Sequence, residues 1–247
     1  MKFNFEKKDK NINKSTEMYL DSGIAEEFAR REKEDTVEHS VVSGVLDNLV
    51  TESFKDKKIK IANLGAGANP QKYEGILKKI KEGSTLDWVD ISSKMLDIAS
   101  KEVDQDDNVN FIKNDFTGYL NTQEDGTLDC VMMQYSINYI ENLEDFLKIL
   151  SKKLNKDGIF VANIGRPVLE NNQYVNFLIN GEEFTGKRNL VDGDRYTIKF
   201  LNQDKTVFAS TEKIFFSDEK IKSTSELLNL TPEIKDIKGF KVLIVKK

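Results

Sequence analysis

The sequence predicts an α/β protein whose doubly wound, mostly parallel sheet ends in an antiparallel C-terminal hairpin. Between residues 58 and 164, short apolar runs alternate with segments of helical periodicity. Strands joined through helices form a parallel sheet that is covered on both faces. Residues 233–237 and 240–245 are instead two strand-like runs separated by Lys238-Gly239, which is typical of a hairpin.

The composition is that of a protein with a charged surface over an ordinary core. Of the 247 residues, 38% are hydrophobic and 32% are charged, and no run approaches the ~20 apolar residues of a membrane span. Residues 1–14 lack the apolar run of a signal peptide, so we expect a cytoplasmic protein. A single cysteine, Cys130, excludes an internal disulfide, and its apolar surroundings predict a core position.

Two helices are expected before the first strand, over residues 23–31 and 36–54. Apolar residues in the second recur at the three- and four-residue spacing of an amphipathic helix. We therefore divide the chain into an N-terminal helical segment, residues 1–57, which is a candidate lid, and a main domain, residues 58–247. The only histidine, His39, falls in this segment and is expected to be structural or at the surface, so no multi-histidine metal site is predicted.

The main domain begins with five expected strands. They cover residues 59–64, 86–91, 109–112, 128–133 and 159–164. The helices expected between them cover residues 71–81, a segment that Ser92 caps, and residues 143–154, with Asp157-Gly158 ending the last.

Three features at the ends of these strands predict a nucleotide-like ligand. The first strand runs into Asn63-Leu64-Gly65-Ala66-Gly67-Ala68-Asn69-Pro70, where glycines permit a sharp turn and close approach of a ligand. Asn69 is a plausible helix cap and Pro70 suits the first helical position. Asp90 ends the second strand, where a carboxylate can accept hydrogen bonds from ribose hydroxyls. Asp115-Phe116 follows the third, where the carboxylate can bind the amino group of an adenine.

Each feature alone also fits a structural role, as a cap, a loop carboxylate or a core ring. Their joint occurrence at carboxyl ends of strands, where open α/β sheets bind ligands, favours a shared site. A dinucleotide site would instead want a third small residue where Pro70 stands, so an NAD-dependent oxidoreductase is disfavoured.

In these segments the chain resembles class I S-adenosylmethionine-dependent methyltransferases. The resemblance covers residues 58–164 and rests on IANLGAGANP, LDWVDISSKMLDIAS, VNFIKNDF, LDCVMMQYSINYIENLEDFLKIL and LNKDGIFVANI. It implies a Rossmann-like sheet of seven strands whose last two form the antiparallel tail, S-adenosyl-L-methionine as cofactor, and methyl transfer. The family often has an acidic residue where this chain has Asn63, which can still hydrogen-bond the amino group of the ligand.

The resemblance also implies residue roles. Gly65, Ala66 and Gly67 would line the methionine part of the cofactor, and Asp90 would hold the ribose. Around the adenine, Ile91 and Met95 would flank the base and Asp115 with Phe116 would fix its edge. Gln134 falls where the methionine moiety meets the entering acceptor.

The acceptor side is expected in the loop after the fourth strand and in the segment after the fifth. Tyr135, Asn138 and Tyr139, with Arg166, are the predicted substrate-binding residues; no catalytic base and no metal ligand is assigned. Residues 166–216 form an insertion that is either an elaborated sheet edge or a cover that excludes water. Turns are expected at Asn180-Gly181 and at residues 202–205, and a strand through Tyr196, Ile198 and Phe200.

A small-molecule acceptor is the favoured prediction, and two alternatives stay open. Gln134 to Tyr139 is similar to a stretch of messenger RNA cap guanine methyltransferases, with Asn138 in place of a histidine, so RNA is a possible partner. A family member that binds cofactor without catalysis, or that modifies protein, is the other. No membrane partner is expected, and the sequence makes no prediction of oligomeric state.

Overall fold

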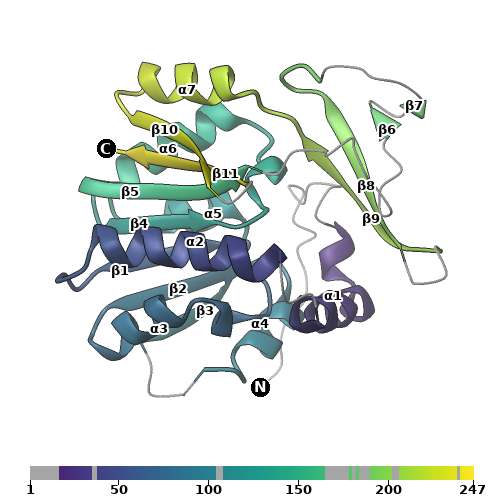
Figure 1. Ribbon diagram of the computed structural model, residues 1–247, viewed down its shortest axis with the longest axis horizontal. Coiled ribbons are helices and arrows are strands. Elements are labelled where there is room, and N and C mark those ends of the chain that lie inside the picture. The colour runs from purple at the N-terminus through teal and green to yellow at the C-terminus, as the bar shows by residue number, and fades with distance from the viewer. Residues whose placement is uncertain are drawn as a thin grey trace.

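The computed structural model describes residues 17–34, 38–103, 108–164, 178–179, 182–183, 190–201, 206–237 and 240–247. Two sheets organise this part of the chain, one of seven strands and one of four (Figure 1). No helix within these ranges is long and apolar enough to cross a membrane.

The seven-stranded sheet has the order β10-β11-β5-β4-β1-β2-β3. From β3 to β5 the strands are parallel, whereas β11 is antiparallel to both β5 and β10. The predicted fold class is therefore confirmed. The strands are β1 (Lys60–Leu64), β2 (Thr85–Asp90), β3 (Val109–Lys113), β4 (Leu128–Met133), β5 (Leu154–Ile164), β10 (Thr231–Ile237) and β11 (Phe240–Lys246).

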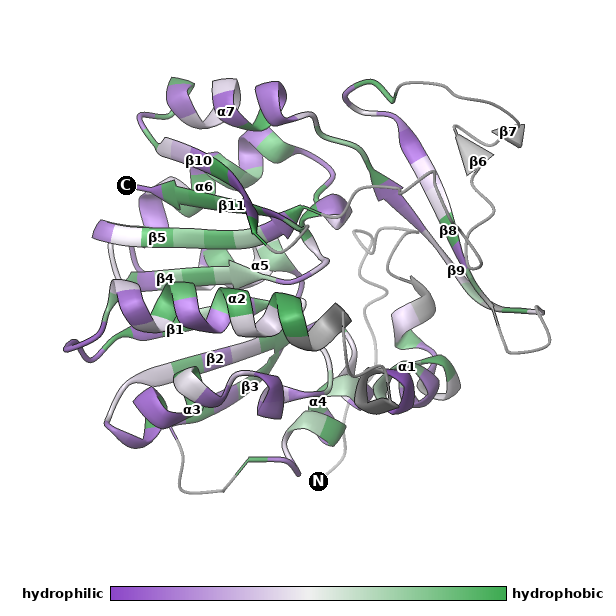
Figure 2. Cartoon of the chain, in the orientation of Figure 1, coloured by the Kyte–Doolittle hydropathy of each residue, from purple (hydrophilic) through white to green (hydrophobic). Residues whose placement is uncertain are grey.

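Helices cover both faces of this sheet, whose strands are largely hydrophobic (Figure 2) and bury apolar residues in a core on each side. One core lies under α5 (Phe116–Thr122), α6 (Leu143–Lys153) and α7 (Asp218–Leu227). The other lies under α2 (Glu38–Ser53), α3 (Glu74–Lys81) and α4 (Ser93–Ala99). Cys130 lies in the second core and is fully buried, as predicted, and burial raises the pKa of its thiol.

The N-terminal helices thus have different positions. Val42, Leu46 and Val50 of α2 are buried against the sheet, so α2 is one of its covering helices. The 3₁₀ turn η1 (Glu17–Leu20) and α1 (Ser22–Glu34) lie beyond the carboxyl ends of the parallel strands (Figure 1). Within the described part of the N-terminal segment, η1 and α1 rather than α2 thus lie on the side of the sheet where a lid is expected.

Two local predictions were wrong at their boundaries. Instead of one helix over 71–81, a 3₁₀ turn η2 (Pro70–Lys72) is followed by α3 from Glu74, because the backbone of Tyr73 leaves the helical region. Pro70 does hold the first position of η2, but the side chain of Asn69 makes no capping hydrogen bond.

The junction of α6 and β5 is the second difference. The helix ends at Lys153, and β5 begins at Leu154, before Asp157-Gly158. Leu128 pairs with Leu154 but Cys130 pairs with Ile159, so the strand carries an irregularity that absorbs the intervening residues. The predicted cap at Ser92 is confirmed, since its side chain accepts from the Met95 nitrogen.

The insertion forms a sheet of its own, in the order β7-β6-β8-β9, and does not extend the main sheet. Its strands are antiparallel and comprise β6 (Leu178–Ile179), β7 (Glu182–Glu183), β8 (Arg195–Leu201) and β9 (Val207–Ile214). The predicted strand through Tyr196, Ile198 and Phe200 is β8. The predicted turns at Asn180-Gly181 and residues 202–205 lie outside the described residues.

Candidate functional site

The glycine loop after β1 folds across the end of β2. Gly65 and Gly67 both have φ of +69°, a conformation that favours glycine. The backbone nitrogens of Gly65 and Ala66 both donate to the carbonyl oxygen of Val89, at 2.9 and 3.0 Å. The loop is therefore fixed against β2, next to Asp90.

Asp90 connects this loop to α4. Its Oδ2 accepts from the Gly67 nitrogen at 2.9 Å, and its Oδ1 accepts from the Ser92 nitrogen at 2.8 Å. The residue is only 8% exposed, and this burial raises the pKa of the carboxyl, opposed by the backbone donors. Each carboxylate oxygen has a further lone pair, so Asp90 can still accept hydrogen bonds from a ligand.

Gly65 lies where the loop after β1 meets the segments that follow β3 and β4. A Cβ atom on Gly65 would stand 2.8 Å from the Cβ of Ser136 and 3.3 Å from Cε1 of Phe116. Ser136 also donates its hydroxyl to the carbonyl oxygen of Leu64, at 2.9 Å. A side chain is thus excluded at Gly65 both by its backbone conformation and by its neighbours.

The residues predicted at the adenine are spread between surface and interior. Asp115 is exposed and caps α5, its Oδ1 accepting from the Gly118 nitrogen at 2.7 Å, while Phe116 is half-buried. Ile91 is half-exposed. Met95 is 3% exposed and belongs to a small cluster with Ala68 and residues of α1, so α1 covers this side of the site.

Asn63 is the polar residue whose burial is least explained by the protein itself. It is 1% exposed, and neither its amide nitrogen nor its amide oxygen has a hydrogen-bond partner in the described part of the chain. Burying such a group without a partner is unfavourable. A ligand with polar groups beside the glycine loop would satisfy it, so the residues present fit a cofactor that carries an amino acid moiety.

Gln134 ties the end of β4 to the helical layer. Its Oε1 accepts from the Ser43 hydroxyl at 3.0 Å and from the hydroxyl of Tyr73. It is half-exposed, so it lies at the margin of the site rather than within the core.

The loop after β4 holds the predicted acceptor residues in three different positions. Tyr135 has φ of +54°, and its backbone nitrogen donates to Asn163 Oδ1 at 2.6 Å. Tyr139 is half-exposed on the turn η3 (Ile137–Tyr139), and its hydroxyl lies 2.8 Å from that of Tyr19. Arg166 lies outside the described residues.

Asn138 lies below the rim of the site, where the sequence had suggested a position on it. It is 1% exposed, and its amide nitrogen donates to the carbonyl oxygen of Ile214 on β9, at 2.8 Å. Its amide oxygen has no partner among the residues described. Asn138 therefore connects the turn η3, after β4, to the inserted sheet.

Four site residues were not predicted, and they join the two candidate covers. Tyr19 of η1 contacts Tyr139 with ring centroids 6.0 Å apart, and lies 5.4 Å from Phe28 of α1. Phe28 in turn contacts Phe200 of β8 at 4.7 Å. Lys213 of β9 lies over the Tyr139 ring, with its Nζ 4.9 Å from the centroid.

A sequence signal for Lys213 exists in the alternation along β9. Ala209, Thr211 and Lys213 are buried, whereas Ser210 is exposed and Glu212 is half-exposed. A lysine in the inward register of a strand is unusual, because buried ammonium groups require partners.

No group of three or more potential metal ligands was found in the described part of the chain.

Comparison with known proteins agrees with this geometry. Residues 64–162 match the family described as "Methyltransferase domain". No curated protein matches the chain significantly.

Solved structures of low sequence identity share its fold. DesVI of Streptomyces venezuelae is 12% identical with a TM-score of 0.60, covering 92% of this chain and 98% of its own. CalS10, an amino pentose methyltransferase from Micromonospora echinaspora, is 11% identical with a TM-score of 0.59, covering 90% and 95%. The 1,6-didemethyltoxoflavin-N1-methyltransferase of Burkholderia thailandensis is 11% identical with a TM-score of 0.52, covering 91% and 87%.

Residues 64–162 thus carry a methyltransferase domain, and the chain shares its fold with methyltransferases of known structure that bind S-adenosylmethionine or S-adenosylhomocysteine. The matched domain and the shared fold support S-adenosyl-L-methionine as the cofactor. The family, the class of enzyme and the cofactor predicted from the sequence are thereby supported.

Proposed function

We propose that the chain transfers the methyl group of S-adenosylmethionine to a small-molecule acceptor. The acceptor would bind between the β4–η3 loop and a cover made of η1, α1 and the β8–β9 sheet. The observation that carries this proposal is the aromatic contact series Tyr139–Tyr19–Phe28–Phe200, which links the two covers beside the strand ends. A covered site suits a small acceptor that must be shielded from water.

Two of the fold neighbours support this choice by their described substrates. CalS10 is an amino pentose methyltransferase, and the Burkholderia enzyme was solved with bound 1,6-didemethyltoxoflavin and S-adenosylhomocysteine. An amino pentose and 1,6-didemethyltoxoflavin are both small molecules.

The cofactor would be held by the residues at the strand ends. Gly65, Ala66 and Gly67 would line its methionine part, with Asn63 and Gln134 supplying polar partners. Asp90 would accept hydrogen bonds from the ribose. Ile91 and Met95, with Asp115 and Phe116, would surround the adenine.

When bound, S-adenosylmethionine supplies an electrophilic methyl group on a sulfonium. The chain's own contribution would be mainly to align the acceptor with this methyl group. Such alignment lowers the barrier because the two reactants no longer have to meet by chance in the right orientation. The rings of Tyr135 and Tyr139 would border the acceptor, and α1 with β8–β9 would exclude water. None of the described residues is assigned as a general base, so an acceptor that is methylated at a protonated atom would release that proton to solvent.

A labelled-methyl transfer assay tests this proposal. The protein is incubated with methyl-labelled cofactor and, side by side, a small-metabolite extract and total RNA. We expect the label in the small-molecule fraction and its loss in the Asp90→Asn variant. Label in RNA or in protein would contradict the proposal, as would tight S-adenosylhomocysteine binding without any transfer.

A further inference from the structure

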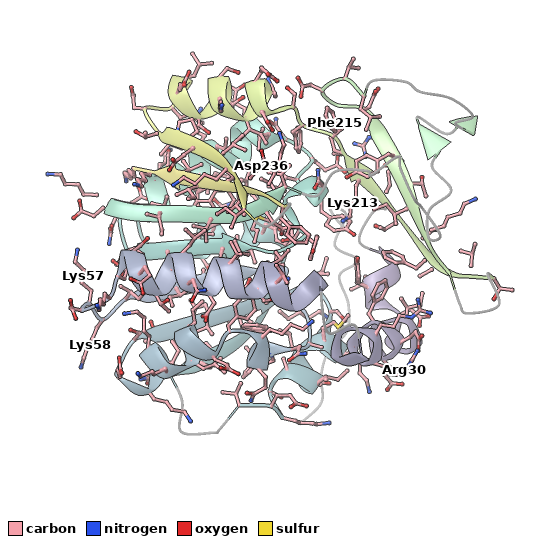
Figure 3. All side chains as sticks on the ribbon, in the orientation of Figure 1. Arg30, Lys57, Lys58, Lys213, Phe215 and Asp236 are labelled. Carbon is pink, nitrogen blue, oxygen red and sulfur yellow. The ribbon has the colours of Figure 1, made fainter. Side chains whose placement is uncertain are left out.

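Lys213 is a buried cation at the acceptor side of the site. It lies near the C-terminal end of β9 (Figure 3), and the residue is 8% exposed. Its Nζ donates to the carbonyl oxygen of Tyr135 at 3.2 Å and lies 4.9 Å from the centroid of the Tyr139 ring. Both partners are electrically neutral.

The acidic residues nearest along the inserted sheet are engaged elsewhere. Glu212 adjoins Lys213, but alternation along the strand directs it to the other face, where it accepts from Arg195 Nη1 at 2.7 Å. Asp194, directly before β8, accepts from the Val191 nitrogen at 3.0 Å. Lys213 forms no ion pair with a carboxylate in the described part of the chain.

Among the described residues, the ammonium group of Lys213 contacts only uncharged partners. Buried charges in proteins are generally paired with an opposite charge, because a carbonyl and a ring replace only part of the lost hydration. A ligand oxyanion would complete the set of partners.

The position of Lys213 separates it from the residues expected to hold the adenosyl group. Tyr135, whose carbonyl oxygen accepts the hydrogen bond from Lys213, follows β4 and precedes Ser136, which lies against Gly65. Asp90 ends β2 and Asp115 follows β3, and β1 lies between these strands and β4. Lys213 therefore reaches the site from the side of the β4–η3 loop.

We propose that Lys213 binds an anionic group of the methyl acceptor, a carboxylate or a phosphate, beside the ring of Tyr139. This inference rests on the proposed transfer to a small molecule and narrows its substrate class to anions. The half-exposed Tyr139 ring offers a surface for an apolar or planar part of the same molecule. Lys213 would thus select the acceptor rather than take part in the methyl transfer itself.

The test is calorimetric titration of the protein saturated with S-adenosylhomocysteine, using benzoate and inorganic phosphate as separate probes. We expect saturable binding of at least one probe, and which one binds distinguishes a carboxylate acceptor from a phosphate acceptor. Lys213→Gln keeps an N–H donor for the Tyr135 carbonyl but removes the charge, and should weaken that binding about tenfold or more. Lys220→Gln, on the exposed surface of α7, is the matched control and should bind as the wild type does.

Three results would overturn the inference. One is that the wild type binds neither probe, and another is that Lys213→Gln binds as well as the wild type. The third is a parallel fall in S-adenosylhomocysteine affinity, which would assign Lys213 to the cofactor. Lys213→Arg, which keeps the charge, should retain probe binding, and its loss there would point to a purely structural role. Absence of S-adenosylhomocysteine binding in the wild type would instead contradict the proposed function.

Discussion

The carboxylate of Asp90 accepts a hydrogen bond from the backbone nitrogen of Gly67 at 2.9 Å, and so joins the loop after β1 to the end of β2. Its other oxygen accepts from the Ser92 nitrogen, at the start of α4. The residue proposed to hold the ribose therefore also fixes the two segments that would enclose the adenosyl group.

Replacing Asp90 with asparagine should weaken S-adenosylhomocysteine binding by roughly 1–3 kcal/mol, because the ribose hydroxyls lose a charged acceptor. Isothermal calorimetry measures the change, and the exposed Asp97→Asn variant on α4 serves as the control. Asp90→Ala should in addition lower the melting temperature, since it leaves the Gly67 and Ser92 nitrogens without their acceptor. Wild-type affinity in Asp90→Asn would remove Asp90 from the site.

The affinity for S-adenosylhomocysteine should fall as the pH is lowered through the raised pKa of Asp90. Burial raises this pKa in the free protein, whereas hydroxyl donors of a bound ribose favour the charged form and lower it. The bound state therefore holds fewer protons, and acid opposes binding. In the free protein the sign is the reverse: the stability contribution of this group is lost as the pH rises through the same pKa. Titrations across the acid range should show the decline in the wild type, and an Asp90→Asn variant with the same decline would assign it to another group.

Gly65→Ala should impair binding far more than Gly126→Ala, although both glycines have positive φ, +69° and +72°. Each substitution introduces strain of about 1–2 kcal/mol. A methyl group at Gly126 meets nothing within 4 Å, whereas at Gly65 it stands 2.8 Å from the Cβ of Ser136. Urea unfolding and calorimetry on the pair separate backbone strain from crowding. Equal effects of the two substitutions would show that Gly65 is needed only for its backbone conformation.

S-adenosylmethionine or S-adenosylhomocysteine should raise the melting temperature, since only the folded chain offers the site. A free ligand concentration of a hundred times the dissociation constant contributes about 2.7 kcal/mol. NADH should have no such effect. Stabilisation by NADH and by neither adenosyl compound would contradict the cofactor.

Tyr139→Ala should reduce methyl transfer at least about tenfold, or ~1.4 kcal/mol in the barrier, with far less change in cofactor affinity. The half-exposed ring would border the acceptor, whereas the proposed adenosyl contacts come from other strand ends. Tyr139→Phe keeps the ring and removes only the hydroxyl that lies 2.8 Å from Tyr19. A loss of ~3–5 kcal/mol of stability in the alanine variant, with parallel losses of binding and turnover, would place Tyr139 in the core instead.

Local patterns predicted the parallel sheet because each element carries its own signal. The predicted strand over residues 128–133 has the same bounds as β4, and the predicted C-terminal hairpin corresponds to the antiparallel pair β10 and β11. The end of α6 was misplaced because Leu154 satisfies two patterns at once, the last apolar residue of the helical stripe and the first of β5. The apolar pattern cannot decide whether such a residue ends the helix or begins the strand, because it would be buried in either case.

The cofactor side of the site was predictable because a strand followed by a turn carries its residues in one short segment. The cover was not, since Tyr19, Phe28 and Phe200 meet only through tertiary packing across about two thirds of the chain. Lys213 likewise contacts Tyr135 and Tyr139, which lie in the loop and turn after β4 and far from Lys213 along the chain. No spacing along the sequence encodes those contacts.

The position of β11 has a consequence for how the chain is made. This strand is the latest of the main sheet along the sequence, yet it lies inside the sheet, between β5 and β10. During synthesis, the edge of β5 that faces away from β4 therefore lacks its native partner until residues 240–246 have left the ribosome. The five parallel strands can associate well before that point. Val242 and Leu243 are fully buried in the finished sheet, so a nascent chain that lacks them exposes both a hydrogen-bonding edge and apolar surface. Chaperone dependence during translation should accordingly be concentrated in that interval.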